Sequence, residues 1–232
     1  SLPTSAASPD YYGAARPDAG LYANSIVAVD LQSGAVRWHF QHVRHDLWDY
    51  DTPAQPILFQ WRKNGTDIPA LAQLTKQGFV FVFNRLTGEP LWEITEQPVP
   101  PSQIPGEKPS PTKPIAPPQL LNPFLMPDDA WGLTPWDRAD CREQLASLHN
   151  LGLFTPTSEK LTLMYPGSLG GPNWGGGALL GDSGILLVNV NNVAFTGRLI
   201  PTPADIDPEP PTRGHPPAGT RMQVTMEGTP YH

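Results

Sequence analysis

The chain has 232 residues, which is enough for one large all-β domain or two small ones. Thirty prolines and twenty-one glycines, with no collagen period, indicate that much of the chain is loop or extended connection. Fifteen basic residues against 22 acidic ones, a net charge of −7 and no basic stripe argue against nucleic acid as a partner.

Other general features narrow the class further. Cys141 is the single cysteine, so no intrachain disulfide is possible. The apolar runs are too short for a membrane-spanning helix, and no signal peptide opens the chain at Ser1, although we expect the true N-terminus to lie upstream.

The first pair of predicted strands lies within residues 22–41, which we take as the first blade signal of the repeat described below. Residues 1–20 are small, proline-rich and expected to be irregular. After them, strands predicted at 25–29 and 35–40 flank the turn Asp30–Gly34. This pattern predicts a β-hairpin.

The same pattern returns 54 residues later, with predicted strands at 79–83 and 89–94 around an Asn-x-x-Thr-Gly turn. Trp38 and Trp92 follow the two turns at the same spacing, and we assign both to packing between strands. A repeat of roughly this length, built from strands and turns, predicts a β-propeller.

Two further strands lie between these hairpins, at 56–61 and 68–74, joined by Asn64-Gly65. Residues 56–94 therefore predict one complete four-stranded blade. Alternate turns of such a meander open at the same end of the sheet, so Asp49 and Lys76 are expected on one face and Asn64-Gly65 on the other.

A proline-rich insertion is expected over residues 95–127, with no strand of its own. A helix is predicted at about 135–148, where Thr134 is the cap and Pro135 the first helical residue. The segment 201–232 returns to proline-rich coil.

A third blade signal covers residues 161–200, with predicted strands at 176–180 and 185–190. By the same alternation of turns, Asn173 and Trp174 are expected on the face that carries Asp49. Only about three blades are represented, so we expect the chain to be an internal fragment or to need blades from a partner.

The stretch from His45 to Pro56 concentrates the chemistry, because it holds three carboxylates, a histidine and two aromatic residues in a loop. Asp49 is the candidate catalytic residue, whereas Asp46 and Asp51 are expected to be structural. Glycoside hydrolysis by Asp46 and Asp49 is an alternative, but it leaves Lys76 and the Asn-Trp loop unexplained.

Six motifs in chain order cover nearly the whole chain: Leu21–Asp30, His45–Pro56, Thr75-Lys76-x-Gly78, Trp131–Thr134, Phe154–Ser158 and Asn173–Gly176. Together they resemble the quinoprotein dehydrogenases that use pyrroloquinoline quinone. The last three motifs point to the membrane-bound glucose, quinate and shikimate branch of that family.

This resemblance implies an eight-bladed propeller with the cofactor on its axis beside a divalent cation, calcium or magnesium. Asp49 would be the general base and a metal ligand. Lys76 would hydrogen-bond the quinone oxygens and assist catalysis, and Asn173 and Trp174 would line the cofactor pocket. The family's asparagine metal ligand is replaced by Ala6, which cannot coordinate a cation.

The implied activity is oxidation of a sugar or cyclic polyol by hydride transfer to pyrroloquinoline quinone, with electrons passed to a membrane quinone. The implied location is the periplasm, at the inner membrane, through a segment not present here. The alternative is a non-catalytic propeller scaffold, or an inactive fragment of such an enzyme, because Ala6 departs from the family pattern.

Overall fold

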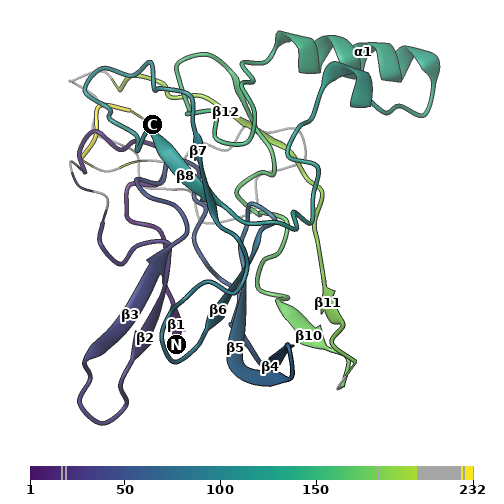
Figure 1. Cartoon of the computed structure of the whole chain (residues 1–232). Coiled ribbons are helices and arrows are strands. Elements are labelled where there is room, and N and C mark those ends of the chain that lie inside the picture. The colour runs from purple at the N-terminus through teal and green to yellow at the C-terminus, as the bar shows by residue number, and fades with distance from the viewer. Residues whose placement is uncertain (17, 19, 182, 203–225, 227, 232) are drawn as a thin grey trace.

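The computed structural model describes residues 1–16, 18, 20–181, 183–202, 226 and 228–231. The fold is mostly β, with one α-helix and one short 3-10 helix (Figure 1). In chain order the elements are β1 (Leu2–Pro3), β2 (Ser25–Val29), β3 (Val36–Gln41), β4 (Ile57–Lys63), β5 (Thr66–Leu74), β6 (Val80–Asn84), β7 (Thr95–Pro98), β8 (Thr112–Ile115), η1 (Pro127–Asp129), α1 (Pro135–Ser147), β9 (Thr162–Met164), β10 (Gly177–Leu179), β11 (Leu186–Val188) and β12 (Phe195–Gly197).

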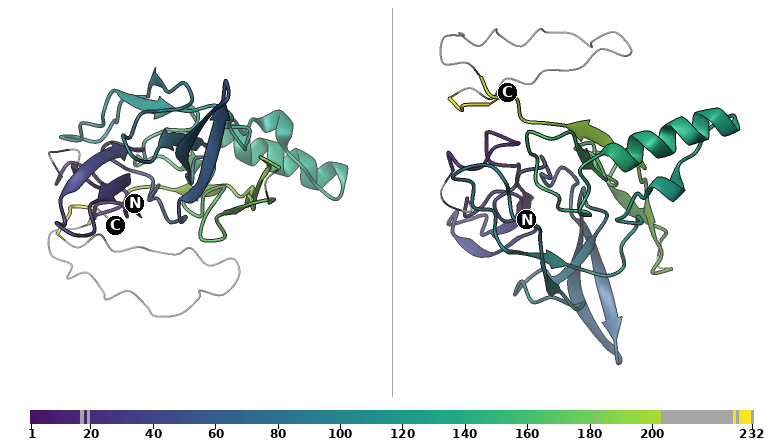
Figure 2. Two further views of the ribbon diagram at one scale, coloured as in Figure 1. Left: turned by 60° about the horizontal axis from the view of Figure 1, so that its bottom comes forward. Right: turned by 90° about the horizontal axis from the view of Figure 1, so that it is seen from above.

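Three antiparallel units stand side by side, as neighbouring propeller blades do: β1-β2-β3, β4-β5-β6 and β10-β11 (Figures 1 and 2). Of the expected hairpins, β2–β3, β4–β5, β5–β6 and β10–β11 are present. In the β4–β5 turn, Asn64 and Gly65 have φ values of 52° and 78°, the left-handed conformation that a two-residue hairpin turn requires. The sheets do not close into a ring within the described residues.

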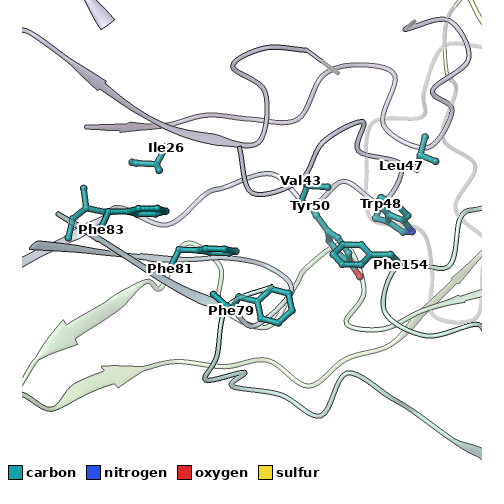
Figure 3. Close-up of a cluster of buried hydrophobic side chains, with 11 residues drawn as sticks. Ile26, Val43, Leu47, Trp48, Tyr50, Phe79, Phe81, Phe83 and Phe154 are labelled. Carbon is teal, nitrogen blue, oxygen red and sulfur yellow. The ribbon is translucent and has the colours of Figure 1, made fainter. Parts of the chain in front are cut away.

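The side chains of β6 alternate between two cores because successive residues of a strand face opposite sides of the sheet. Phe79, Phe81 and Phe83 point into the core shared with β2 and β3, where the rings lie in a row (Figure 3). Val80 and Val82 face the other core, which side chains of β11 help to cover. The strand β6 is therefore buried on both faces of the sheet, whereas β4 keeps one exposed face.

The two repeated tryptophans pack between strands, as expected. The indole Nε1 of Trp38 donates to the carbonyl of Arg85 at 3.1 Å, in the turn of the neighbouring sheet. Gly88 in that turn leaves room for the ring, because a Cβ there would lie 2.7 Å from Trp38. Trp92 packs edge-to-face on Trp61, with ring centroids 5.7 Å apart.

The middle sheet has three strands rather than the four predicted for residues 56–94. The segment 89–94 meets β6 only at a bridge between Pro90 and Phe83, flanked by hydrogen bonds from Asn84 N to Glu89 O and from Leu91 N to Val82 O. The pairing ends there because the chain beyond Leu91 leaves β6 and continues into β7, which pairs with β8 in a different sheet.

The insertion at 95–127 differs from its prediction because it contains the hairpin β7–β8. Likewise, β1 pairs with β2 although residues 1–20 were expected to be irregular. Both pairings join segments with little alternation of apolar residues, which is why the sequence pattern did not show them.

The last third of the described chain also departs from a single blade. β9 pairs with β12, and β10 pairs with β11, so residues 161–200 form two separate sheets. Helix α1 begins at a capping box of Thr134 and Asp137 and ends one residue before the predicted position. Most of the segment 201–232 lies outside the described residues. None of the described helices is long and apolar enough to cross a bilayer.

Candidate functional site

The site loop, residues 42–52, follows β3 and is organised by the buried carboxylate of Asp46. That carboxylate accepts hydrogen bonds from the backbone N–H groups of Trp48 at 3.0 Å and Tyr50 at 2.8 Å. The amide Nδ2 of Asn24, in the turn just before β2, donates to it at 2.9 Å. Asp46 therefore fixes the course of the loop through three donors.

The residues on either side of Asp49 point into the core. Trp48 and Tyr50 are fully buried and pack against Phe154 (Figure 3). The indole of Trp48 donates to the carbonyl of Thr155 at 2.7 Å. Asp49 lies between these two anchors with a φ of 57°, an uncommon conformation for a residue other than glycine. Its side chain stays partly exposed, at 32%.

The structure brings Asp49 and Lys76 together, as the alternation of turns predicted. Lys76 lies in the turn between β5 and β6, and the residue is only 5% exposed. Its Nζ donates to the backbone carbonyl of Asp49 at 2.7 Å and lies 3.4 Å from the Asp49 Oδ2. It also forms a close ion pair with Asp51.

The surroundings of Asp49 shift the pKa of its carboxyl group toward neutral pH. Burial raises the pKa of the Asp49 carboxyl to about 6, the ammonium group of Lys76 opposes this rise, and the neighbouring carboxylate of Asp51 adds to it. A carboxyl group with a pKa in this range is ionised at pH 7 and can accept a proton.

The glycine-rich loop 166–174 lies directly on Lys76. The amide of Gly171 donates to the Lys76 carbonyl at 2.8 Å, and a Cβ on Gly170 would lie 2.5 Å from the Lys76 side chain. In the same loop, Asn173 uses its amide locally, with Nδ2 donating to Leu169 O and Oδ1 accepting from the N–H of Trp174. The Trp174 ring is 84% exposed.

Two residues near Asp49 were not singled out from the sequence as site residues. Asp51 pairs with Lys76, and only its spacing of two residues from Asp49 could have indicated this. Burial raises the pKa of Tyr11 to about 12, its side chain hydrogen-bonds Ser168, and the charge of Asp49 also acts on it. No local sequence pattern predicts the contact between Tyr11 and Ser168, because these two residues are far apart in the sequence.

The structure argues against hydrolysis by two carboxylates. Asp46 is 2% exposed and its oxygens are occupied by three donors, so it cannot face a substrate opposite Asp49.

The donors present do not fit a hard cation. Asp49 is engaged by Lys76, Ala6 has no ligand atom in its side chain, and no group of three His, Cys, Asp or Glu side chains in the described part of the chain could hold a metal ion. The same surroundings do fit part of a site for a planar, anionic quinone. Lys76 supplies a fixed ammonium group, and Trp174 supplies an uncovered aromatic plane.

The fold and this site define one part of a β-propeller domain with a candidate site at the end of its sheets. The family model described as "PQQ: Glucose/ethanol/alcohol dehydrogenase, beta-propeller domain" matches residues 2–232, and the chain belongs to this family. The family predicted from the sequence motifs is confirmed.

Sequence relatives match most or nearly all of the chain. The chain is 39% identical to the quinate/shikimate dehydrogenase (quinone) of Acinetobacter baylyi over 99% of its own length and 29% of the relative's. It is 38% identical to quinoprotein glucose dehydrogenase A of Acinetobacter calcoaceticus, again over 99% of the chain and 29% of the relative. With the quinoprotein glucose dehydrogenase of Escherichia coli the identity is 36%, over 86% of the chain and 25% of the relative. The chain thus spans less than a third of the length of these relatives.

Proposed function

We propose that the protein containing this chain oxidises a hydroxyl group of a sugar or cyclic polyol of the glucose, quinate or shikimate type. The observation that carries the proposal is the pairing of Asp49, partly exposed and with a raised pKa, with the fixed ammonium group of Lys76. Relatives named for quinate, shikimate and glucose support the substrate class.

In this proposal Asp49 accepts the proton of the substrate hydroxyl while a hydride leaves the carbon that bears this hydroxyl. When bound, pyrroloquinoline quinone supplies the oxidising power by accepting that hydride. The Asp49 carbonyl and the Asp51 carboxylate hold the Lys76 ammonium group in a fixed position. Its charge can therefore stabilise negative charge that develops beside it without first reorienting. Trp174 offers an aromatic plane for a flat ring system.

The rest of the site comes, in our proposal, from other blades of the longer protein. Support comes from the lengths of the relatives and from the open sheet edges of the chain. A calcium or magnesium ion, expected from the family resemblance, would need ligands beyond Asp49.

We further propose a periplasmic location at the inner membrane, with a membrane quinone as electron acceptor. The word quinone in the name of the A. baylyi relative supports the acceptor. Fractionation of the full-length protein and assays with a short-chain ubiquinone test this part independently of the substrate.

The decisive experiment reconstitutes the full-length protein with pyrroloquinoline quinone and calcium or magnesium, and assays glucose, quinate and shikimate with a dye acceptor. Asp49→Asn should lower kcat/KM by about 10²- to 10⁴-fold, because the proton acceptor is lost. Asp140→Asn, on the exposed surface of α1, is the matched control and should behave as wild type. An Asp49→Asn variant with the wild-type rate would show that Asp49 is not the base.

A non-catalytic scaffold is the second candidate, favoured by Ala6 and by the incomplete cation ligands. Titration of the apo-protein with pyrroloquinoline quinone, followed by tryptophan fluorescence, separates the two. Saturable quenching that weakens in Lys76→Met supports the dehydrogenase, whereas an unchanged signal supports the scaffold.

A further inference from the structure

The proline-rich insertion places a buried amine beside the site loop. Lys113, on β8, is fully buried. Its Nζ donates to the backbone carbonyl of Arg44 at 2.5 Å and lies 5.4 Å from the centre of the Trp48 ring. Lysine is rarely buried to this degree, so the contacts at its amine must offset the cost of removing it from water.

Arg44, in the site loop, reaches back to the same hairpin. Its guanidinium donates to the carbonyl of Thr112 at 2.9 Å and to the hydroxyl of Ser110 at 3.3 Å. It also forms a bidentate ion pair with the carboxylate of Glu96 on β7. Each segment therefore donates to the backbone of the other, and both strands of the hairpin are joined to the loop.

We propose that this reciprocal contact is a latch and that Lys113 is a positioning residue for Asp49. Lys113 contacts the Arg44 carbonyl and the Trp48 ring, the two ends of the segment that leads into Asp49. The positive φ of Asp49 costs energy relative to glycine, so its neighbours must hold it in place. The catalytic consequence rests on the proposed function.

The donor atom of Lys113 matters more for this role than its charge. Burial lowers the pKa of Lys113 to about 7, while the carboxylates of Asp46 and Glu96 oppose that change and Arg44 adds to it. An amine donates to a carbonyl in either protonation state. The latch therefore does not require the charged form.

Lys113→Met separates positioning from packing. Methionine fills a similar volume and keeps contact with Trp48, but it cannot donate to the Arg44 carbonyl. Lys108→Met is the matched control, since Lys108 belongs to the same insertion and is exposed.

The test uses the full-length protein in two forms. In the reconstituted holoenzyme, Lys113→Met should lower kcat roughly 10- to 100-fold while KM stays within about two-fold, because misplacement of a catalytic group slows the reaction more than it weakens binding. In the apo-protein, hydrogen exchange of the amides at 44–50 should become at least about 10-fold faster, with the strands β4–β6 unchanged. Lys108→Met should change neither quantity.

Three results would each overturn one part of the proposal. Loop exchange in Lys113→Met equal to that in Lys108→Met would refute the contact, and faster exchange with unchanged kcat would refute the positioning role. Faster exchange throughout the domain would show a purely structural role.

If Lys113→Met does not fold, Arg44→Gln removes the other half of the latch from a partly exposed position, and the same criteria apply. If no polyol is oxidised by the wild type, the proposed function fails, yet exchange in the apo-protein still decides whether the latch exists.

Discussion

Replacing Asp46 by asparagine tests how the site loop is held. The carboxylate is buried, with the Trp48 amide on Oδ1 and the Tyr50 amide and Asn24 Nδ2 on Oδ2. Burial raises the pKa of Asp46, and these donors oppose that change by stabilising the ionised form. A neutral amide of the same shape removes the charge and turns one acceptor into a donor.

The magnitude follows from the three hydrogen bonds. The amide loses fewest contacts with its NH₂ toward Trp48, which leaves the buried Trp48 N–H without an acceptor at a cost of about 1–3 kcal/mol. The other two bonds persist but lose their charge assistance, which roughly halves their strength. We expect Asp46→Asn to lower the free energy of unfolding by about 2–4 kcal/mol, a large share of the stability of a typical domain.

Denaturant unfolding at pH 7 measures this change, and Asp140→Asn on the exposed surface of α1 controls for the loss of one negative charge. Hydrogen exchange at the Trp48 and Tyr50 amides should rise in Asp46→Asn alone. Equal stability of the two variants would refute the reasoning, because it would mean that the three donors do not depend on the carboxylate.

Two further predictions concern the neighbouring glycine loop and a buried histidine. Gly170→Ala should lower the free energy of unfolding more than Gly65→Ala in equilibrium unfolding. Both glycines have a positive φ, but only at Gly170 does the new Cβ collide with Lys76. Equal losses of stability in the two variants would contradict this prediction. Burial lowers the pKa of His42 to about 3. Between pH 3 and 6.5 the unfolded state therefore binds more protons than the folded state. The free energy of unfolding should rise with pH in this range, by up to about 1.4 kcal/mol per pH unit. His42→Gln should flatten this slope in pH-dependent unfolding, whereas His39→Gln, on the exposed part of β3, should leave it in place.

Part of the site could be predicted because it depends on strand order alone. Alternate turns of an antiparallel sheet open at one end, which was enough to bring Asp49 and Lys76 together. The choice of Asp51 as the closer partner of Lys76, and the local engagement of the Asn173 amide, could not be predicted. Those contacts depend on side-chain directions that the backbone of a particular loop sets.

The fold divides in the same way. The hairpin turn at Asn64-Gly65 and the start of α1 at Thr134 were visible in sequence because one or two residues satisfy the local backbone. The pairing of β7 with β8 and of β9 with β12 was not visible, because those strands are short and lack a strong apolar alternation.

The sequence by itself therefore determined the family, the turns, the main hairpins and the residue types of the site loop. Only the tertiary structure decided that Lys113 reaches Arg44, that Trp48 donates to Thr155 and that burial moves the pKa of Asp49. The physical reason is range. Turns and caps are fixed by hydrogen bonds within a few residues, whereas burial and its electrostatic effects arise where segments distant in the chain exclude water together.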